Sequence, residues 1–190
     1  MSHLWDSERI GSVKDWGVLA VASVKRREKE QWFVNTQSKT KLCLYINLKT
    51  CFEKEEYLAW NLSFHQRSLL AQFRCGSNSL RIEVGRWKQE KVEERWCPVC
   101  VTGAIESEEH VVVKCSFYSR LRDKMLEEIR TSSGYDLNVL ADDAQTLIDI
   151  LIGHGLRSRE VRRIIGCAAA KFLSSAMSLR ANFLRAVGEG

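Results

Sequence analysis

The sequence has a single proline, Pro98, among its 190 residues, and an unremarkable 11 glycines. Scarce proline argues against proline-rich linkers, and the low content of both residues argues against collagen-like repeats and turn-dense all-β architecture. There is no run of about 18 apolar residues, so we expect no transmembrane helix and no membrane partner. The first residues show no charged region followed by an apolar one, which argues against a secretory signal. We therefore expect an intracellular protein of the nucleus or cytoplasm.

What the sequence does contain is typical of a globular protein. Hydrophobic residues make up 45% and charged residues 28%, with six tryptophans and seven phenylalanines to fill a core. Seven cysteines are an odd number, and without a secretory signal thiols or metal ligands are a better interpretation than a disulfide framework. Four of them are scattered in apolar or helical contexts, and we expect them to pack in the core: Cys43, Cys51, Cys75 and Cys167.

The net charge of +5 is concentrated at one end of the sequence. Residues 155–190 contain seven basic and two acidic side chains, whereas residues 1–154 balance at 22 of each sign. The run KRREKEQ at 25–31 is a second charged segment. It is interpreted either as a solvated helix face or as a nuclear-import or RNA-contacting patch.

Apolar periodicity predicts a mainly α, bundle-like domain, to which the cysteine and histidine spacing described below adds a small structural CCHC zinc module. Helices are predicted over 8–35, 53–73, 117–130, 139–152 and 158–187. The type of segment 42–52 stays open, while alternation of Leu80, Ile82 and Val84 predicts a strand or extended segment over 79–87. We expect three regions: an N-terminal helical region (1–73), the zinc module with its preceding extended segment (74–122), and a C-terminal helical region (123–190).

The strongest motif is C-x2-C-x9-H-x4-C, formed by Cys97, Cys100, His110 and Cys115. Two cysteines three apart on a tight turn can direct both sulfurs at one centre, and a returning segment can add an imidazole and a third thiolate. Zn²⁺ suits this soft donor set. The alternative is three buried free cysteines and a surface histidine.

We expect no enzymatic activity. Four protein ligands would leave no open position for water, which indicates a structural zinc ion. The sequence LADD at 140–143 resembles the paired aspartates of polymerases, but no earlier strand carries a partner aspartate. Acidic residues also favour the first turn of a helix, so we predict a helix start there.

The sequence from Phe73 to Arg122 resembles the region downstream of the reverse transcriptase in LINE-type (non-LTR) retrotransposon polyproteins. The likeness spans roughly residues 39–122 and extends more weakly over the remainder. The residues that match the family pattern are Arg74, Gly76, Leu80, Glu83, Gly85, Arg86, Arg95, Cys97, Cys100, Glu109, His110, Cys115, Tyr118 and Arg122. Cys75 and Val111 depart from it mildly, since the family has an aliphatic residue and an aromatic one there. The polymerase and endonuclease domains are absent, so the chain is similar to a C-terminal fragment, a truncated copy or a domesticated derivative.

The resemblance implies that the zinc-knuckle region binds RNA or DNA during target-primed reverse transcription. Cations beside aromatic residues form a plausible footprint for single strands just before the cysteine cluster. The candidate nucleic-acid-binding residues are Arg74, Arg81, Arg86, Trp87, Lys88 and Arg95, with Lys91 and Trp96 interleaved. In the competing interpretation, glutamates neutralise this face and both tryptophans lie in the core.

Two further functions remain open. The first is a domesticated protein–protein interaction module that dimerises through the helix around 158–187. The second is a remnant without function.

Overall fold

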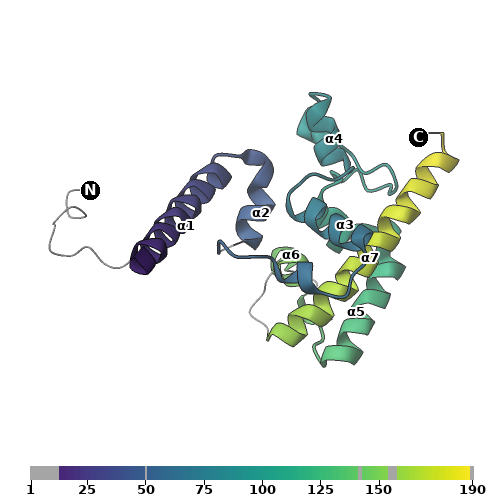
Figure 1. Cartoon of the computed structure of the whole chain (residues 1–190). Helices are drawn as coiled ribbons and strands as arrows, with labels where there is room; N and C mark the ends of the chain where they lie inside the picture. The colour runs from purple at the N-terminus through teal and green to yellow at the C-terminus, as the bar shows by residue number, and fades with distance from the viewer. Residues whose placement is uncertain (1–12, 50, 141–142, 154–157, 189–190) are drawn as a thin grey trace. The chain divides into compact units, whose positions relative to one another are not determined.

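The computed structural model describes residues 13–49, 51–140, 143–153 and 158–188, with the side chain of Cys43 excepted. It divides into two compact units, Met1–Thr40 and Lys41–Gly190, which are described separately. The α-helices are α1 (Val13–Gln37), α2 (Cys43–Leu48), α3 (Phe64–Arg74), α4 (Arg81–Trp87), α5 (Ser119–Ser133), α6 (Ala144–Ile152) and α7 (Arg159–Ala186) (Figure 1). Shorter helical turns are η2 (Thr40–Leu42), η3 (Glu56–Ala59), η4 (Val92–Glu94), η5 (His110–Lys114), η6 (Ser116–Tyr118) and η7 (Asn138–Leu140).

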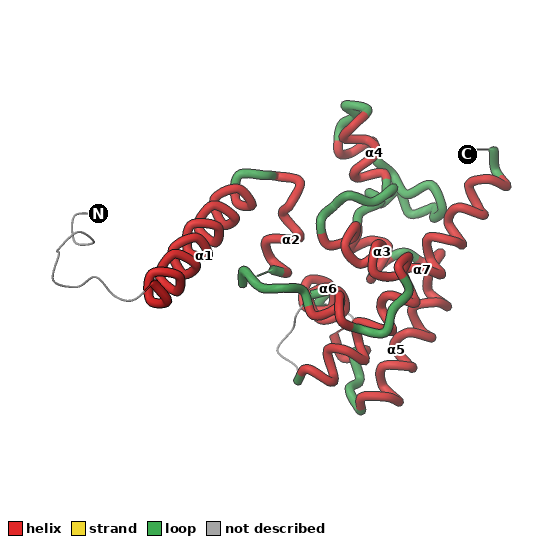
Figure 2. Tube along the Cα trace, in the orientation of Figure 1, coloured by secondary structure: helices red, strands yellow, loops and turns green. Residues whose placement is uncertain are grey.

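The predicted mainly α class is confirmed. Figure 2 shows helices joined by loops, and within the described ranges there is no strand. The one extended pairing there is an isolated antiparallel bridge between Trp96 and Ile105. Segment 42–52, whose type periodicity left open, is helical in its first half, where it forms α2.

The first unit contains α1, and the predicted helix over 8–35 is confirmed from residue 13 onward, with residues 8–12 outside the described part. Thr36 is the buried residue of this helix. Apolar side chains along it, such as Val18 and Phe33, are exposed, and so is the charged run at 25–31.

The core of the second unit is built on α7. This helix packs against α5, α3 and α6, and α5 and α7 lie side by side in Figure 1. Ser158 caps its first turn by accepting a hydrogen bond from the amide of Val161, as a serine at this position is expected to do. Its apolar side chains Ile165, Phe172 and Ala176 are each at most 4% exposed, whereas Leu179 and Val187 near the C-terminal end are 38% and 53% exposed. The apolar face of α7 is therefore buried within its own unit over most of its length but not at its end.

Among the described helices, α7 alone is long and apolar enough to cross a membrane by length and composition. Half of the apolar window is buried within the structure, and the core helix of a soluble protein passes the same test. Residues Ile165, Phe172 and Leu173 of this helix are buried, whereas Leu179 is 38% exposed.

The predicted helix over 53–73 is interrupted. It consists of η3 and α3, and Trp60 between them has extended backbone. Ser63 starts α3 through a capping box with Gln66, each side chain bonding the other residue's amide. The break lets the Trp60 ring pack against Gly166 of α7, where an added Cβ would lie 2.0 Å from the ring.

The prediction of extended structure over 79–87 is wrong, because residues 81–87 form α4. The backbone amides at the N-terminus of α4 find their hydrogen-bond acceptors outside the segment, on Glu106. The carboxylate of Glu106 accepts from the Arg81 amide at 2.8 Å, and its backbone carbonyl accepts from the Ile82 amide at 3.1 Å. Five alternating residues are too few to separate a strand from a short helix that is capped by a distant residue.

The remaining predicted helices are present with shifted bounds. The segment 117–130 corresponds to α5, the segment 139–152 to α6, and the segment 158–187 to α7. Asp143 caps α6 by accepting a hydrogen bond from the Thr146 amide at 3.0 Å, so the predicted helix start is confirmed at this residue. Asp142 lies outside the described residues.

The structure groups the chain differently from the three predicted regions, whose boundaries lay at 73/74 and 122/123. It places residues 41–190 in one unit because α7 packs against helices from both sides of the zinc module. Distant segments that share one core fold as one body.

Candidate metal centre

Cys97 and Cys100 lie on a short ribbon, residues 95–106, in which the chain reverses direction. The Cys97 amide donates to the Ala104 carbonyl at 2.8 Å, and the Glu106 amide donates to the Arg95 carbonyl at 3.0 Å. Between them the chain turns through Cys100 and Gly103, whose φ of +67° suits glycine. Cys97 is 6% exposed and Cys100 is half-buried, so the turn directs both sulfurs inward.

The other two side chains lie at the two ends of η5, a single π-helical turn: His110 is its first residue and Cys115 follows its last. Its closing hydrogen bond runs from the Cys115 amide to the His110 carbonyl at 2.6 Å, an i→i+5 link. His110 and Cys115 are separated by the same interval, so the π turn brings their side chains to one side. Their exposed fractions are 5% and 0%. A π turn is rare and is often found at functional sites.

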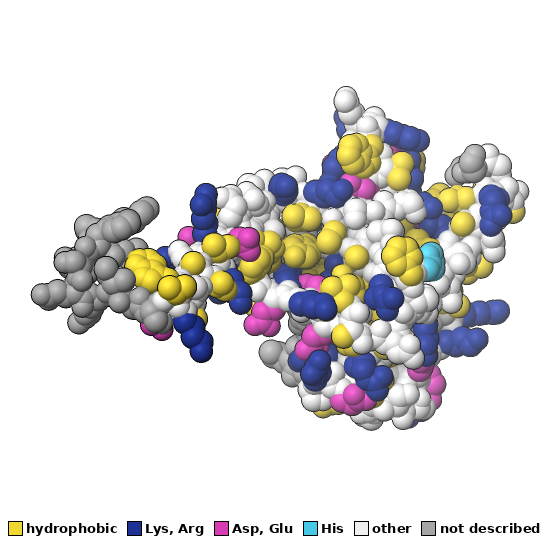
Figure 3. Space-filling model, in the orientation of Figure 1, with side chains coloured by type: hydrophobic (Ala, Val, Ile, Leu, Met, Phe, Trp, Pro, Cys, Tyr) yellow, Lys and Arg dark blue, Asp and Glu magenta, His cyan; other side chains and the backbone are white. Residues whose placement is uncertain are grey.

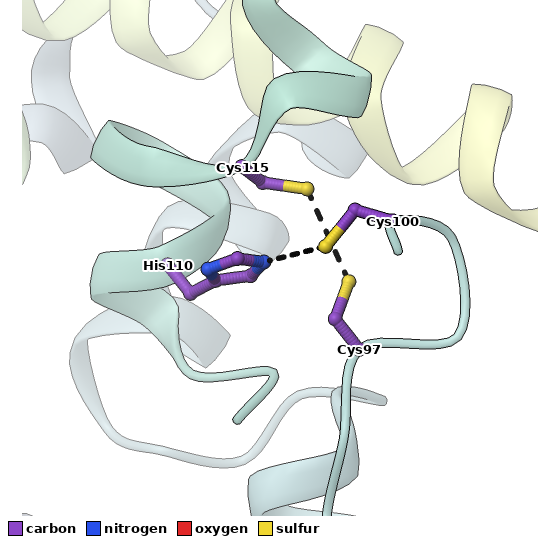
Figure 4. Close-up of side chains that lie close together, drawn as sticks. All are labelled: Cys97, Cys100, His110 and Cys115. Carbon is purple, nitrogen blue, oxygen red and sulfur yellow. Dashed lines mark hydrogen bonds between the residues drawn. The ribbon is translucent and has the colours of Figure 1, made fainter. Parts of the chain in front are cut away.

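The four side chains converge on one point, as Figure 4 shows. The Sγ atoms of Cys97 and Cys115 are 4.0 Å apart, and Cys100 Sγ lies 3.3 Å from His110 Nε2. All four donor atoms lie within 4.8 Å of one another. The predicted grouping of these residues is therefore confirmed, and the alternative with a surface histidine is wrong because His110 is buried.

The spacing fits a tetrahedral ion. Zinc–sulfur bonds of about 2.3 Å place two sulfurs about 3.8 Å apart across a tetrahedron, close to the observed 4.0 Å. The widest separation exceeds that edge by about 1 Å, which small side-chain rotations can close. Three sulfurs and one imidazole nitrogen form a soft set that can hold a metal ion.

Protonation links these groups to one another. The pKa of Cys97 is raised to about 12, first by its hydrogen bond with Cys115 and then by burial. The same hydrogen bond lowers the pKa of Cys115. Hydrogen bonding to Cys97 raises the pKa of His110 in spite of burial, which acts in the opposite direction. A divalent cation at the centre would replace the shared protons.

Glu106 ties the ribbon to the helices, a role that sequence analysis missed. Its carboxylate is 0% exposed and accepts two hydrogen bonds from Arg180 of α7, at 2.7 and 2.8 Å. The same carboxylate caps α4 through the Arg81 amide. Glu106 stands in the acidic run ESEE, whose glutamates look alike in sequence, so nothing there marks it as the buried one.

Arg122 of α5 supports the other half of the centre. Its guanidinium donates to the carbonyls of Val112 at 2.9 Å, Val111 at 3.3 Å and Cys115 at 2.9 Å. It thus binds carbonyl groups at the end of the π turn, including that of a ligand residue. Its place in the retrotransposon-like pattern was the one signal in the sequence that singled it out.

Two of the six candidate nucleic-acid-binding residues are buried, so their assignment needs correction. Arg74 is 3% exposed, lies 3.0 Å from Glu55 and donates to the Ile152 carbonyl. Arg95 is 8% exposed and donates to the backbone carbonyls of Ile82 and Glu90. Both guanidinium groups are used to hold the fold together, and neither is available to a phosphate.

The other four candidates lie at the surface on α4 and the residue after it. Arg81 pairs with Glu90 at 2.7 Å and Arg86 pairs with Glu83 at 3.1 Å, so glutamates do neutralise part of this face. Lys88 is exposed. The exposed fractions of Trp87 and Trp96 are 75% and 60%, which rules out the interpretation that both are core residues.

The expectation that the other cysteines pack in the core is only partly met. Cys75 and Cys167 are half-buried, whereas Cys51 is exposed. The side chain of Cys43 lies outside what the structure describes. Burial raises the pKa of both half-buried thiols, which favours the unreactive protonated form.

Comparisons with models of protein families, with curated proteins and with solved structures gave no match. The interpretation of the centre therefore depends on its own geometry and donor chemistry.

Proposed function

We propose that this chain is a zinc-dependent nucleic-acid-binding module of retrotransposon origin, with zinc in a structural role. The metal is argued from its donors: three cysteine sulfurs and one histidine nitrogen within 4.8 Å favour Zn²⁺ over harder ions that prefer oxygen. Such a closed set stabilises a short segment that has little apolar material of its own.

The observation that carries the proposal is the surface beside the centre. Figure 3 shows Lys and Arg side chains next to exposed hydrophobic ones over α4. Trp87 is 75% exposed at the end of this helix, and Lys88 follows it. The Lys41 ammonium lies 5.7 Å from the centre of the Trp87 ring and is also paired with Glu83 at 3.1 Å. Cations for phosphates beside aromatic rings for bases are the usual surface of single-strand binders.

The retroelement origin is supported by the structural roles of the residues that carry the resemblance. Arg122 and Arg95 hold backbone carbonyls around the ribbon, and Cys97 to Cys115 supply the ligands. Gly85 lets the Arg95 side chain cross α4, because an added Cβ would lie 2.6 Å from Arg95 Cγ. The matching residues thus build one structural motif.

A salt series of nucleic-acid binding tests the proposal. Labelled RNA and DNA are titrated with the zinc-loaded chain, and affinity is expected to fall as salt rises because phosphate contacts release counterions. Lys88→Glu is expected to weaken binding, whereas Lys54→Glu, which changes an exposed lysine in the loop before η3, serves as the control. Absence of binding at low salt, or equal effects of both substitutions, would refute it.

The interaction module that dimerises through the helix at 158–187 stays a prediction. Part of the apolar surface of this helix is buried against α5, α3 and α6 of the same chain, whereas Leu179 is 38% exposed.

A further inference from the structure

A groove runs between α4, the turn that carries the first two cysteines, and the last part of α7. Arg81 and Lys88 line it from α4, Trp96 and Pro98 from the ribbon, and Arg180 and Leu184 from α7. We propose that this groove binds single-stranded nucleic acid with one unpaired base stacked on Trp96. The inference rests on the proposed function and deepens it, because it names the form of nucleic acid and the site that selects it.

Trp96 has an exposed side chain on a backbone that is held in place. Its neighbours Arg95 and Cys97 are 8% and 6% exposed, whereas Trp96 itself is 60% exposed. The backbone on each side is fixed by the hydrogen bonds of the ribbon and by the bridge to Ile105. A rigid indole loses little conformational freedom when a flat ring stacks on it, so it is well suited to bind a base.

The side chains that line the groove offer apolar contacts but few charges that are not already paired. Pro98 and Leu184 offer apolar contacts, while the lining guanidinium groups of Arg81 and Arg180 already pair with Glu90 and Glu106. Glu94 also lines the groove, and Lys88 is exposed there. Binding should therefore depend on stacking at Trp96, with a small number of phosphate contacts near Lys88.

This balance favours a single strand over a duplex. In a duplex the faces of paired bases inside the stack are covered by their neighbours, so an indole that lines a groove meets mainly edges and phosphates. A single strand can turn one base outward and place its phosphates along the rim. Because every base has a flat face, we expect weak sequence preference.

The experiment compares two exposed tryptophans, one inside the groove and one outside its lining. The zinc-loaded full chain is titrated against a labelled oligonucleotide of about 12 nucleotides, as a single strand and as the duplex of the same sequence. Trp96→Ala is expected to weaken single-strand binding at least about tenfold, and Trp96→Phe to retain most of it. The matched control, Trp16→Ala, changes an exposed tryptophan of α1 that does not line the groove and is expected to change this affinity much less. Zinc content is measured for each variant to show that the centre is intact.

The outcomes are separable. Tighter binding of the single strand together with a loss confined to Trp96→Ala supports the proposal. Equal affinity for duplex and single strand, or full affinity in Trp96→Ala, overturns the groove assignment while leaving nucleic-acid binding in place. If the unaltered chain binds neither form at low salt, the proposed function fails and the groove assignment fails with it.

Discussion

At the residue scale, the central feature of the structure is a cluster of three sulfurs and one imidazole nitrogen whose atoms lie within 4.8 Å of one another. Cys115 is 0% exposed and Cys97 is 6% exposed, yet their sulfurs are 4.0 Å apart and share a hydrogen bond. Ordinary core packing would place apolar groups around a buried thiol instead of two more thiols and a histidine. The arrangement is best explained by an ion that all four side chains bind.

Removing one ligand should lower the metal content of the chain. Cys97→Ser is expected to bind zinc substoichiometrically, because a serine oxygen is a poor replacement for a thiolate. Cys51→Ser changes an exposed cysteine outside the cluster and is expected to leave metal content unchanged. Metal-to-protein ratios from elemental mass spectrometry measure both, and equal ratios in the two variants would contradict the ligand assignment.

Sequence reasoning could find the ligands but not the buried charges. The interval C-x2-C-x9-H-x4-C carries geometric information because each ligand type and spacing limits where a side chain can reach. Burial of Arg74 and Arg95 depends on carbonyl groups brought near by tertiary structure, such as those of Ile152 and Ile82. Arginines in a basic run look the same in sequence whether they face water or a carbonyl.

At the scale of elements, the ribbon that carries Cys97 and Cys100 holds α4 in place through two hydrogen bonds. Glu106 caps α4 through the Arg81 amide, and Arg95 donates to the Ile82 carbonyl at 2.8 Å. Both bonds come from the segment whose turn carries Cys97 and Cys100. The first turn of α4 is thus held by this segment. Its position should therefore depend on the metal-bound state of the ribbon.

Metal removal is expected to loosen α4 before the helical core. Chelation should speed amide hydrogen exchange in 81–87 and 96–116, because the ribbon loses the ion that fixes its two halves. Amides of α3, which packs against α7 and α2, are expected to keep most of their protection. Hydrogen exchange followed by mass spectrometry provides the measurement. Unchanged protection of α4 after verified metal loss would show that the ribbon does not position it.

Arg122 offers a second test at this scale, since it supports the π turn from α5. Arg122→Ala is expected to weaken zinc affinity about tenfold or more, as is usual when a partner that orients a ligand is removed. Arg120→Ala removes an exposed arginine from the same helix and is expected to have little effect. Competition with a zinc-binding dye measures both affinities. Equal affinities would mean that η5 holds His110 and Cys115 without help from Arg122.

The elements were predicted well where periodicity extends over several turns and poorly where it does not. The long stripe of α7 and the four-turn pattern of α5 are set by their own residues. The seven-residue α4 and the break at Trp60 are set by distant partners, Glu106 and Gly166. Local sequence does not contain that information.

At the scale of the whole second unit, one buried ion pair joins the metal centre to the core. Arg180 of α7 makes two hydrogen bonds to the fully buried Glu106, which also caps α4. Residues 41–190 form one compact unit, and this pair is one of the contacts that join the cysteine-rich segment to α7. A pairing across 74 residues of sequence has no local signature.

Breaking that pair is expected to destabilise the unit strongly. Arg180→Met leaves the Glu106 carboxylate buried without its counter-charge, which should cost about 3–5 kcal/mol of unfolding free energy. Arg185→Met alters an exposed arginine of the same helix and should change it by less than about 0.5 kcal/mol. Urea unfolding of the zinc-loaded chain measures both. Equal midpoints would show that the pair is not essential to the fold.

The most direct test of the central claim is X-ray absorption at the zinc edge of the purified chain. We predict one zinc ion with three sulfur neighbours at about 2.3 Å and one nitrogen at about 2.0 Å. In Cys97→Ser, a zinc ion with two sulfur neighbours instead of three would assign Cys97 as a ligand. A chain that binds no zinc, or a zinc shell made only of oxygen and nitrogen, would contradict the account.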